Sequence, residues 1–251
     1  MTTNAAFDYS GRVEDPVRDD LRLAHQQAWE RIAQPGTWWS GRERVAIAAE
    51  SRAAEYCVFC RKRREALSPF GETGNHDDVS ADVLPLAAID AIHRLVTDAS
   101  RLTETWLKEL FEEGVPDTHY VELLSVVVSI RSIDIFHRAM GISPEPLPEP
   151  VAGEPSNKRP VAAASGVGWV PMLPSRLRAG DEADLWRGPA PNVIRAMSLV
   201  PDAVRWLKEL SAVHYLSMEN MPDFTRGRGP LSRAQTELVA GRVSAINECF
   251  Y

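Results

Sequence analysis

The stretch that decides the fold is residues 40–60, SGRERVAIAAESRAAEYCVFC. It begins with a Ser-x-x-Glu capping box at Ser40, the usual signature of a helix N-terminus. Small and apolar residues then recur at helical intervals, and the stretch ends in the pair Cys57 and Cys60. We expect one helix that continues to about Leu67, with both cysteines on one face.

The same pattern returns near the C-terminus. A second capping box begins at Ser232, and Cys249 follows it at the distance that separates Cys57 from Ser40. The capping box and the cysteine recur at the same spacing without gaps, which indicates an internal duplication. On this register the residue that matches Cys60 would be residue 252, one position past the end of the chain.

Helical periodicity extends over most of the remaining sequence. Strand signals are weak, because the β-prone run at 125–129 lies inside a longer apolar pattern of helical period. The sequence therefore predicts an all-α fold. Besides the helix at 40–67, helices are expected at 19–34, 82–97, 100–114, 118–141, 181–187, 191–200, 202–218 and 232–251.

A proline-rich segment interrupts these helices. Residues 143–160 contain six prolines with glutamates between them, a composition typical of a stiff, extended linker. We therefore divide the chain into a helical domain at 1–143, a linker and loop at 144–180, and an incomplete second repeat at 181–251.

Composition narrows the class of protein. With 251 residues and 44% hydrophobic content the chain can form a sizeable core. A net charge of −7 argues against non-specific binding to nucleic acid, and no run of about 18 apolar residues predicts a membrane span. Three cysteines do not make a disulfide framework, and no secretory signal is visible. We expect a cytoplasmic protein, in which a Cys-x-x-Cys pair is typically catalytic or metal-binding.

A Cys-x-x-Cys pair is a minimal device for dithiol redox chemistry. One thiolate attacks a peroxide, and the resulting sulfenic acid is resolved by the second thiol as a disulfide. An external dithiol then reduces the disulfide. Such a site also needs groups that accept and donate protons.

Four residues near the first pair are candidates for assisting it. Arg61 and Arg64 would stabilise a thiolate, or form a solvated basic face. Glu50 could accept a proton from Cys57, or pair with a surface arginine. His76 could fold back onto the pair, or remain on the surface of its loop.

Glu237 and Cys249 are the candidate catalytic residues of the second repeat. In an unbroken helix their side chains would point about 120° apart. A kink near Asn247 would bring them together and place Cys249 at a helix N-terminus, where the dipole stabilises a thiolate. Otherwise Glu237 is an early-turn acid that the same dipole favours.

We expect neither a metal nor a cofactor. Zinc sites commonly have four ligands, often with a second pair of closely spaced Cys or His residues. No His-x(3–5)-His pair accompanies Cys57 and Cys60. We expect His93, His119 and His137 to pack or cap within their own helices.

The C-terminal stretch from residue 231 resembles the signature helix of the alkylhydroperoxidase D-like (AhpD-like) proteins of the carboxymuconolactone decarboxylase superfamily. In that family a Glu precedes a Cys-x-x-Cys pair by 12 residues, and a His follows four residues after the second Cys. Glu237 and Cys249 match this pattern. The second Cys and the His would be residues 252 and 256.

Residues 37–143 resemble a diverged copy of the same domain, and residues 190–251 resemble the opening half of another. In the first copy Val45 stands where the family has its Glu, and Arg64 stands where it has its His. The resemblance implies an all-helical homo-oligomer that reduces hydroperoxides, with a lipoyl or thioredoxin-type dithiol as electron donor.

On this resemblance Cys249 and residue 252 would be the principal pair, with Glu237 in the proton relay. Cys57 and Cys60, without the family's Glu and His, would then support weak peroxidase turnover or none. The absence of residue 252 has three explanations: a truncated gene, an ordinary stop codon, or a UGA codon for selenocysteine that is read as stop. Some relatives use a Cys-x-x-selenocysteine pair, so we favour the third hypothesis, which the codon after Tyr251 would test. The rival hypothesis is a non-enzymatic helical scaffold or redox sensor.

Overall fold

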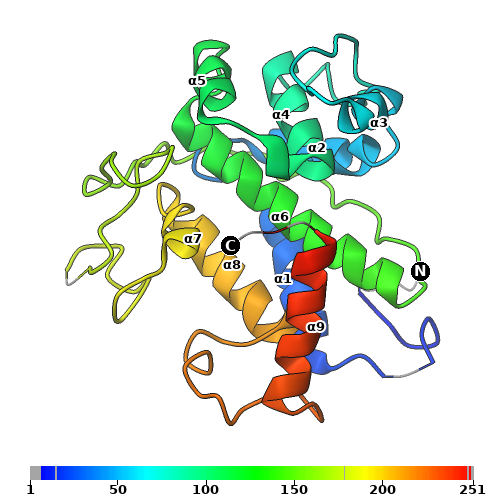
Figure 1. Ribbon diagram of the computed structural model, residues 1–251, viewed down its shortest axis with the longest axis vertical. Helices are drawn as coiled ribbons and strands as arrows, with labels where there is room; N and C mark the ends of the chain where they lie inside the picture. The colour runs from blue at the N-terminus through cyan, green and yellow to red at the C-terminus, as the bar shows by residue number, and fades with distance from the viewer. Residues whose placement is uncertain (1–6, 15, 178, 248, 250–251) are drawn as a thin grey trace.

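The computed structural model describes residues 7–14, 16–177, 179–247 and 249. These residues form helices and connecting loops, and their only β pairing is an isolated bridge between Ala164 and Met172. The all-α fold expected from the sequence is confirmed (Figure 1). The helices are α1 (Asp19–Ala33), α2 (Gly41–Ala54), α3 (Val58–Glu65), α4 (Leu86–Thr97), the 3-10 turn η1 (Ala99–Arg101), α5 (Glu104–Glu112), α6 (Asp117–Ala139), α7 (Asn192–Arg195), α8 (Pro201–His214) and α9 (Arg233–Ile246).

The long helix α6 is the centre of the packing. It contacts α1, α2, α4 and α8, and in Figure 1 it crosses the middle of the molecule. One continuous apolar core joins residues of the first helices, such as Ile47 and Ile92, to Leu199 and Val204 in the C-terminal part. Each fully buried aliphatic side chain of this kind contributes roughly 1.5–3 kcal/mol to the free energy of unfolding.

The expected single helix from residue 40 to residue 67 is wrong. The chain leaves the helix after Ala54 and starts a new one at Val58. Glu55, at the end of α2, forms ion pairs with Arg131 and Arg138 of α6, and these contacts hold the chain where α2 ends. The break leaves Cys57 as the N-cap of α3 instead of a residue on a helix face.

Both expected capping boxes are confirmed. Ser40 accepts a hydrogen bond from the Glu43 amide, and Ser232 accepts one from the Gln235 amide. Elsewhere in the C-terminal part the helices are shorter than expected: residues 181–187 form turns, and the helix expected at 191–200 is reduced to Asn192–Arg195.

The proline-rich segment lies along the first helices as extended chain. The Val151 amide donates to the Ala33 carbonyl at 2.8 Å, and the Asn157 amide donates to the Thr37 carbonyl at 2.8 Å. The indole of Trp29 donates to the Pro146 carbonyl at 2.8 Å. These bonds fix the segment against α1 and the loop that follows it.

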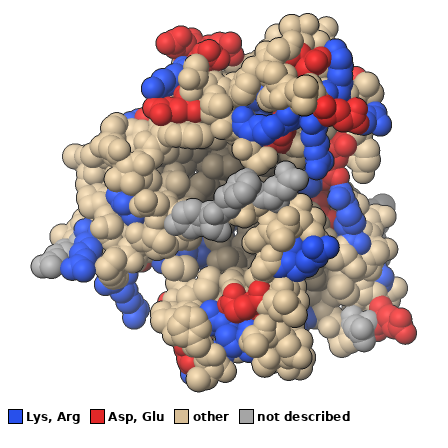
Figure 2. Space-filling view, in the orientation of Figure 1, with Lys and Arg blue, Asp and Glu red and all other residues tan. Residues whose placement is uncertain are grey.

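The surface carries both signs of charge. On the face shown in Figure 2, Lys and Arg side chains lie among Asp and Glu side chains in small separate groups. None of the helices in the described residues is both long enough and apolar enough to cross a lipid bilayer.

Candidate redox and metal-binding centre

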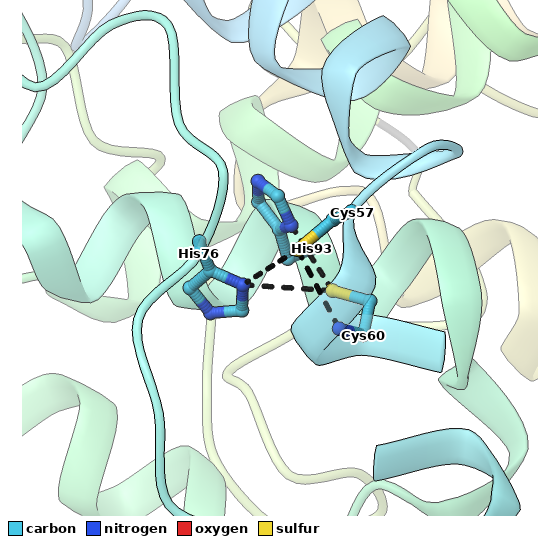
Figure 3. Close-up of side chains that lie close together, drawn as sticks. All are labelled: Cys57, Cys60, His76 and His93. Atoms are coloured by element: carbon cyan, nitrogen blue, oxygen red, sulfur yellow. Dashed lines mark hydrogen bonds between the residues drawn. The ribbon is translucent and has the colours of Figure 1, made fainter. Parts of the chain in front are cut away.

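Four side chains from three separate segments meet beside α3. Cys57 and Cys60 come from the start of that helix, His76 comes from the loop between α3 and α4, and His93 comes from α4. Figure 3 shows the two imidazole rings directed at the two sulfur atoms. Both cysteines are free thiols, 2% and 1% exposed.

Cys57 occupies the N-cap of α3. Its sulfur accepts a hydrogen bond from the Cys60 amide at 3.5 Å, so it takes the position that a Ser or Asp oxygen usually fills. The Val58 amide donates to Asp77 at 2.8 Å. The first amides and the dipole of a helix N-terminus stabilise negative charge, and here the Cys57 sulfur lies at that terminus and accepts from one of those amides.

His93 links Cys60 to Glu50. Its Nδ1 lies 3.0 Å from the Cys60 sulfur, and its Nε2 lies 2.7 Å from Glu50 Oε1. Burial raises the pKa of Glu50, but hydrogen bonds from His93 and the Val79 amide outweigh it and hold the pKa below its ordinary value. Glu50 is therefore a carboxylate that accepts the Nε2 proton, and Nδ1 presents its lone pair to the sulfur.

His76 is held in the same way from the other side. Its Nδ1 lies 3.7 Å from the Cys57 sulfur and 3.5 Å from the Cys60 sulfur. Its Nε2 lies 3.0 Å from Asp90 Oδ1. Burial raises the pKa of Asp90, but hydrogen bonds from His76 and Arg63 and the charge of Arg94 bring it well below its ordinary value, so Asp90 is ionised.

The environment of Cys60 favours the neutral thiol. Burial, with the neighbouring Cys57, raises the pKa of Cys60 to about 12. The buried guanidinium of Arg63 lies 3.9 Å from the Cys60 sulfur and lowers that pKa only in part. Cys60 therefore loses its proton only when a nearby group or ion compensates the charge.

A cavity of about 370 Å³ leads to the pair. Cys57, Cys60, Arg61, Arg64 and Thr97 are among the residues that line it. Arg61 and Arg64 are exposed, so they place positive charge at its wall without contacting a sulfur in the hydrogen bonds described here. The pair is thus buried but bordered by a space large enough for a small substrate.

The expectation that Glu50 pairs with a surface arginine is wrong, since Glu50 is fully buried against His93. The alternative that His76 stays on the surface is also wrong, because this side chain folds back onto both sulfurs. The proton-relay role given to Glu50 and the thiolate-stabilising role given to Arg61 and Arg64 stay predictions.

Glu237 and Cys249 lie at opposite ends of α9. Glu237 accepts hydrogen bonds from Tyr215 at 2.6 Å and Arg233 at 2.5 Å near the helix start. The helix then runs unbroken to Ile246, and the exposed Cys249 follows its end. Glu248, where a kink was expected, lies outside the described residues.

Sequence analysis missed His93 and Asp90 as members of the site. The expectation that His93 only packs or caps is wrong, because its Nδ1 meets Cys60. Both residues lie on α4 with an Asp-x-x-His spacing, which places them on one helix face. This Asp-x-x-His motif follows His76 closely in the sequence, and it is the signal that could have indicated the site.

Neither the protein-family models, nor the curated proteins, nor the solved structures with which the chain was compared contain a match to it.

Proposed function

We propose that the protein is a thiol-dependent oxidoreductase, a peroxidase or disulfide reductase, in which Cys57 and Cys60 form the redox pair. The observation that carries the proposal is the line of contacts from Cys60 through His93 to Glu50, next to a Cys57 sulfur at a helix N-terminus. A Cys–His–carboxylate line is the usual arrangement for moving a proton to and from a thiol.

The resemblance to AhpD-like proteins supports the same chemistry, with one change. At this pair the family's Glu and His positions are occupied by Val45 and Arg64. Glu50 and His93 stand in their place: His93 reaches the Cys60 sulfur from α4, and Glu50, on α2, supports His93 from its outer nitrogen. We therefore propose that this pair can turn over, where sequence analysis expected weak activity or none.

In the proposed reaction the Cys57 thiolate attacks one oxygen of a hydroperoxide ROOH. The O–O bond breaks and Cys57 becomes a sulfenic acid. The alkoxide leaves as ROH with the proton that the Cys57 thiol had given to His76, whose Nδ1 lies 3.7 Å from that sulfur. The Cys60 thiol then gives its proton to His93 and attacks the Cys57 sulfur. The hydroxide leaves as water with that proton, and the Cys57–Cys60 disulfide remains.

Glu50 acts by stabilising the imidazolium that His93 becomes in this step. The two electrons that reduced the peroxide came from the two sulfurs. A dithiol of the lipoyl or thioredoxin type restores them by exchange, and its own sulfurs end as a disulfide. A reducing compartment such as the cytoplasm would keep the resting pair reduced.

The test is peroxide consumption by the reduced, chelator-treated full-length protein, with cumene hydroperoxide as substrate and excess dihydrolipoamide as donor. Mass spectrometry of a single turnover should show a Cys57–Cys60 disulfide. Cys57→Ser should abolish both readouts. Glu50→Gln should slow disulfide formation by about 100-fold or more, whereas Glu65→Gln, which changes an exposed acid on α3, should not.

Turnover that survives Cys57→Ser, or that falls in Cys249→Ser instead, would sink the proposal. Folding of each variant is checked by circular dichroism, because Glu50 is buried. A second candidate function, a redox sensor, is favoured by the burial of both sulfurs. It predicts one disulfide per chain on peroxide addition and no further peroxide consumption with dihydrolipoamide.

A further inference from the structure

We propose that the reduced pair, together with His76 and His93, binds one zinc ion in a four-ligand site. The metal site rests on ligand geometry alone. Its coupling to oxidation, described below, rests on the proposed redox function.

The four donor atoms have the spacing that a tetrahedral metal requires. The two sulfurs and one nitrogen of each imidazole all lie within 4.8 Å of one another. Zinc bonds of about 2.0–2.3 Å to nitrogen and sulfur place tetrahedral ligands roughly 3.3–3.8 Å apart. Three of the four separations between a sulfur and an Nδ1 atom are 3.0, 3.5 and 3.7 Å, so small side-chain movements would complete the coordination.

Each histidine already has the outer partner of a metal ligand. Nε2 of His93 is held by Glu50, and Nε2 of His76 is held by Asp90. A carboxylate on the outer nitrogen fixes the tautomer and leaves the inner lone pair for the ion, which is the common support of zinc-bound histidine.

The donor set identifies the metal class. Two thiolates and two imidazoles suit zinc and exclude hard ions such as magnesium and calcium, which take oxygen ligands. Two thiolates would also balance the double positive charge of the ion inside a buried site. Four protein ligands leave no open position, so the ion would be structural, joining α3, α4 and the loop that carries His76.

Zinc and the disulfide use the same sulfur atoms and therefore exclude each other. Oxidation of the zinc-bound form would proceed as two zinc-bound thiolates plus ROOH plus two protons giving the disulfide, ROH, water and free zinc. The two electrons come from the sulfurs, and the metal keeps its charge. Zinc would protect the resting thiols, and oxidation would release it.

The first experiment titrates the reduced, metal-free full-length protein with zinc or cobalt under anaerobic conditions. Zinc content after removal of loosely bound metal should be one per chain. Cobalt should give the ligand-field and thiolate charge-transfer absorption of a tetrahedral thiolate site. A reduced wild-type protein that keeps no zinc and shows no such absorption overturns the metal site.

Variants then test the ligand set. Asp90→Asn should weaken zinc binding by about 10- to 100-fold, and His76→Gln should weaken it further. His119→Gln is the matched control, because His119 packs beside Trp38 and Trp39, outside the four-residue cluster. Equal affinities for His76→Gln and His119→Gln would overturn the assignment of His76 as a ligand.

Release of zinc by cumene hydroperoxide, followed with a chromogenic chelator, tests the coupling. One zinc should appear per disulfide formed. Zinc binding without peroxide oxidation would leave the metal site standing and contradict the redox function. Peroxide turnover in a protein that binds no zinc would support the redox function and contradict the metal site.

Discussion

Buried histidines form two polar clusters in the interior of the molecule. His76 and His93 face sulfur, whereas His25 faces Tyr9 at 2.7 Å and His214 at 2.9 Å. The first two have carboxylates on their outer nitrogens and the third has none in its hydrogen bonds. The carboxylates can balance a positive charge on His76 or His93, whereas the surroundings of His25 disfavour such a charge.

The His25 cluster predicts a stability that depends on pH. Burial, with the nearby His214 and His137, lowers the pKa of His25 to about 3, and burial also lowers the pKa of His214. The unfolded chain takes up protons below about pH 6.5, while the folded chain keeps His25 neutral. Stability should therefore fall as the pH falls below 6.5, by about 1.4 kcal/mol per pH unit for His25.

Urea unfolding at pH 7.5 and pH 5.0 measures this effect. Most carboxylates contribute little in that interval, because their ordinary pKa values lie below it. Burial raises the pKa of Glu122, which favours the folded state at the lower pH and opposes the effect of His25, so the decisive comparison is between the wild-type protein and a His25 variant. His25→Gln should reduce the difference in unfolding free energy between the two pH values. An equal difference in the wild-type protein and in His25→Gln would contradict the assignment.

The sequence allowed prediction only of those site residues that lie close together in the chain. Cys57, Cys60, Glu50 and His76 could be selected because they lie close together in the chain. His93 contacts Cys60 from 33 positions away, and only the packing of α4 on α2 and α3 brings it there. The Asp-x-x-His spacing on α4 indicates that Asp90 and His93 share a helix face, but spacing alone does not show that this face meets the two cysteines.

At the scale of elements, α2 and α9 share their N-terminal signal but differ in how far their side chains are buried. Both begin with a capping box. In α2, Ile47 and Ala54 are fully buried between neighbouring helices, whereas the residues that match them in α9, Val239 and Ile246, are 58% and 63% exposed. The interpretation as a repeat describes the local sequence pattern. Within the part of the chain that the structure describes, this face is buried by neighbouring helices in α2 and is exposed at the matching positions of α9.

This contrast predicts different costs for the same kind of substitution. Ile47→Ala should lower the free energy of unfolding by about 2–5 kcal/mol, because it leaves a cavity in the core. Val239→Ala, at the matching position of α9, should change it by no more than about 0.5 kcal/mol. Urea denaturation at pH 7.5 measures both, and equal losses would contradict the packing of α9 described above.

Helix boundaries were predictable where the stop signal is local. The end of α6 is such a case: Gly141 has a φ of +70°, and the amides of Gly141 and Ile142 bond back to the last turn. The break after Ala54 has no local signal of this strength. What marks it in the structure is Glu55, which pairs with arginines of α6 far along the chain.

At the scale of the whole molecule, the C-terminal part completes the core of the N-terminal part. Helix α8 packs on α1 and α6, and Val204 and Leu210 are buried there. The division at residue 143 and the expected homo-oligomer stay predictions. The exposed apolar residues of α9 make it the first surface to examine for self-association.

A chain shortened to residues 1–143 tests how far the first helices depend on the rest. We expect a lower midpoint of thermal unfolding than in the full chain, since removal of α8 exposes apolar surface on α1 and α6. Circular dichroism during heating measures the midpoint, and light scattering reports aggregation. An unchanged midpoint would show that residues 1–143 fold independently.

The sulfur at the start of α3 has a consequence for what an observer could see in solution. The atom that closes the first turn of this helix is also the atom that would gain or lose electrons. A change in its oxidation state would alter the acceptor of the Cys60 amide, and with it the first turn of an eight-residue helix. The rate of amide hydrogen exchange in that turn would then differ between the reduced and the oxidised pair.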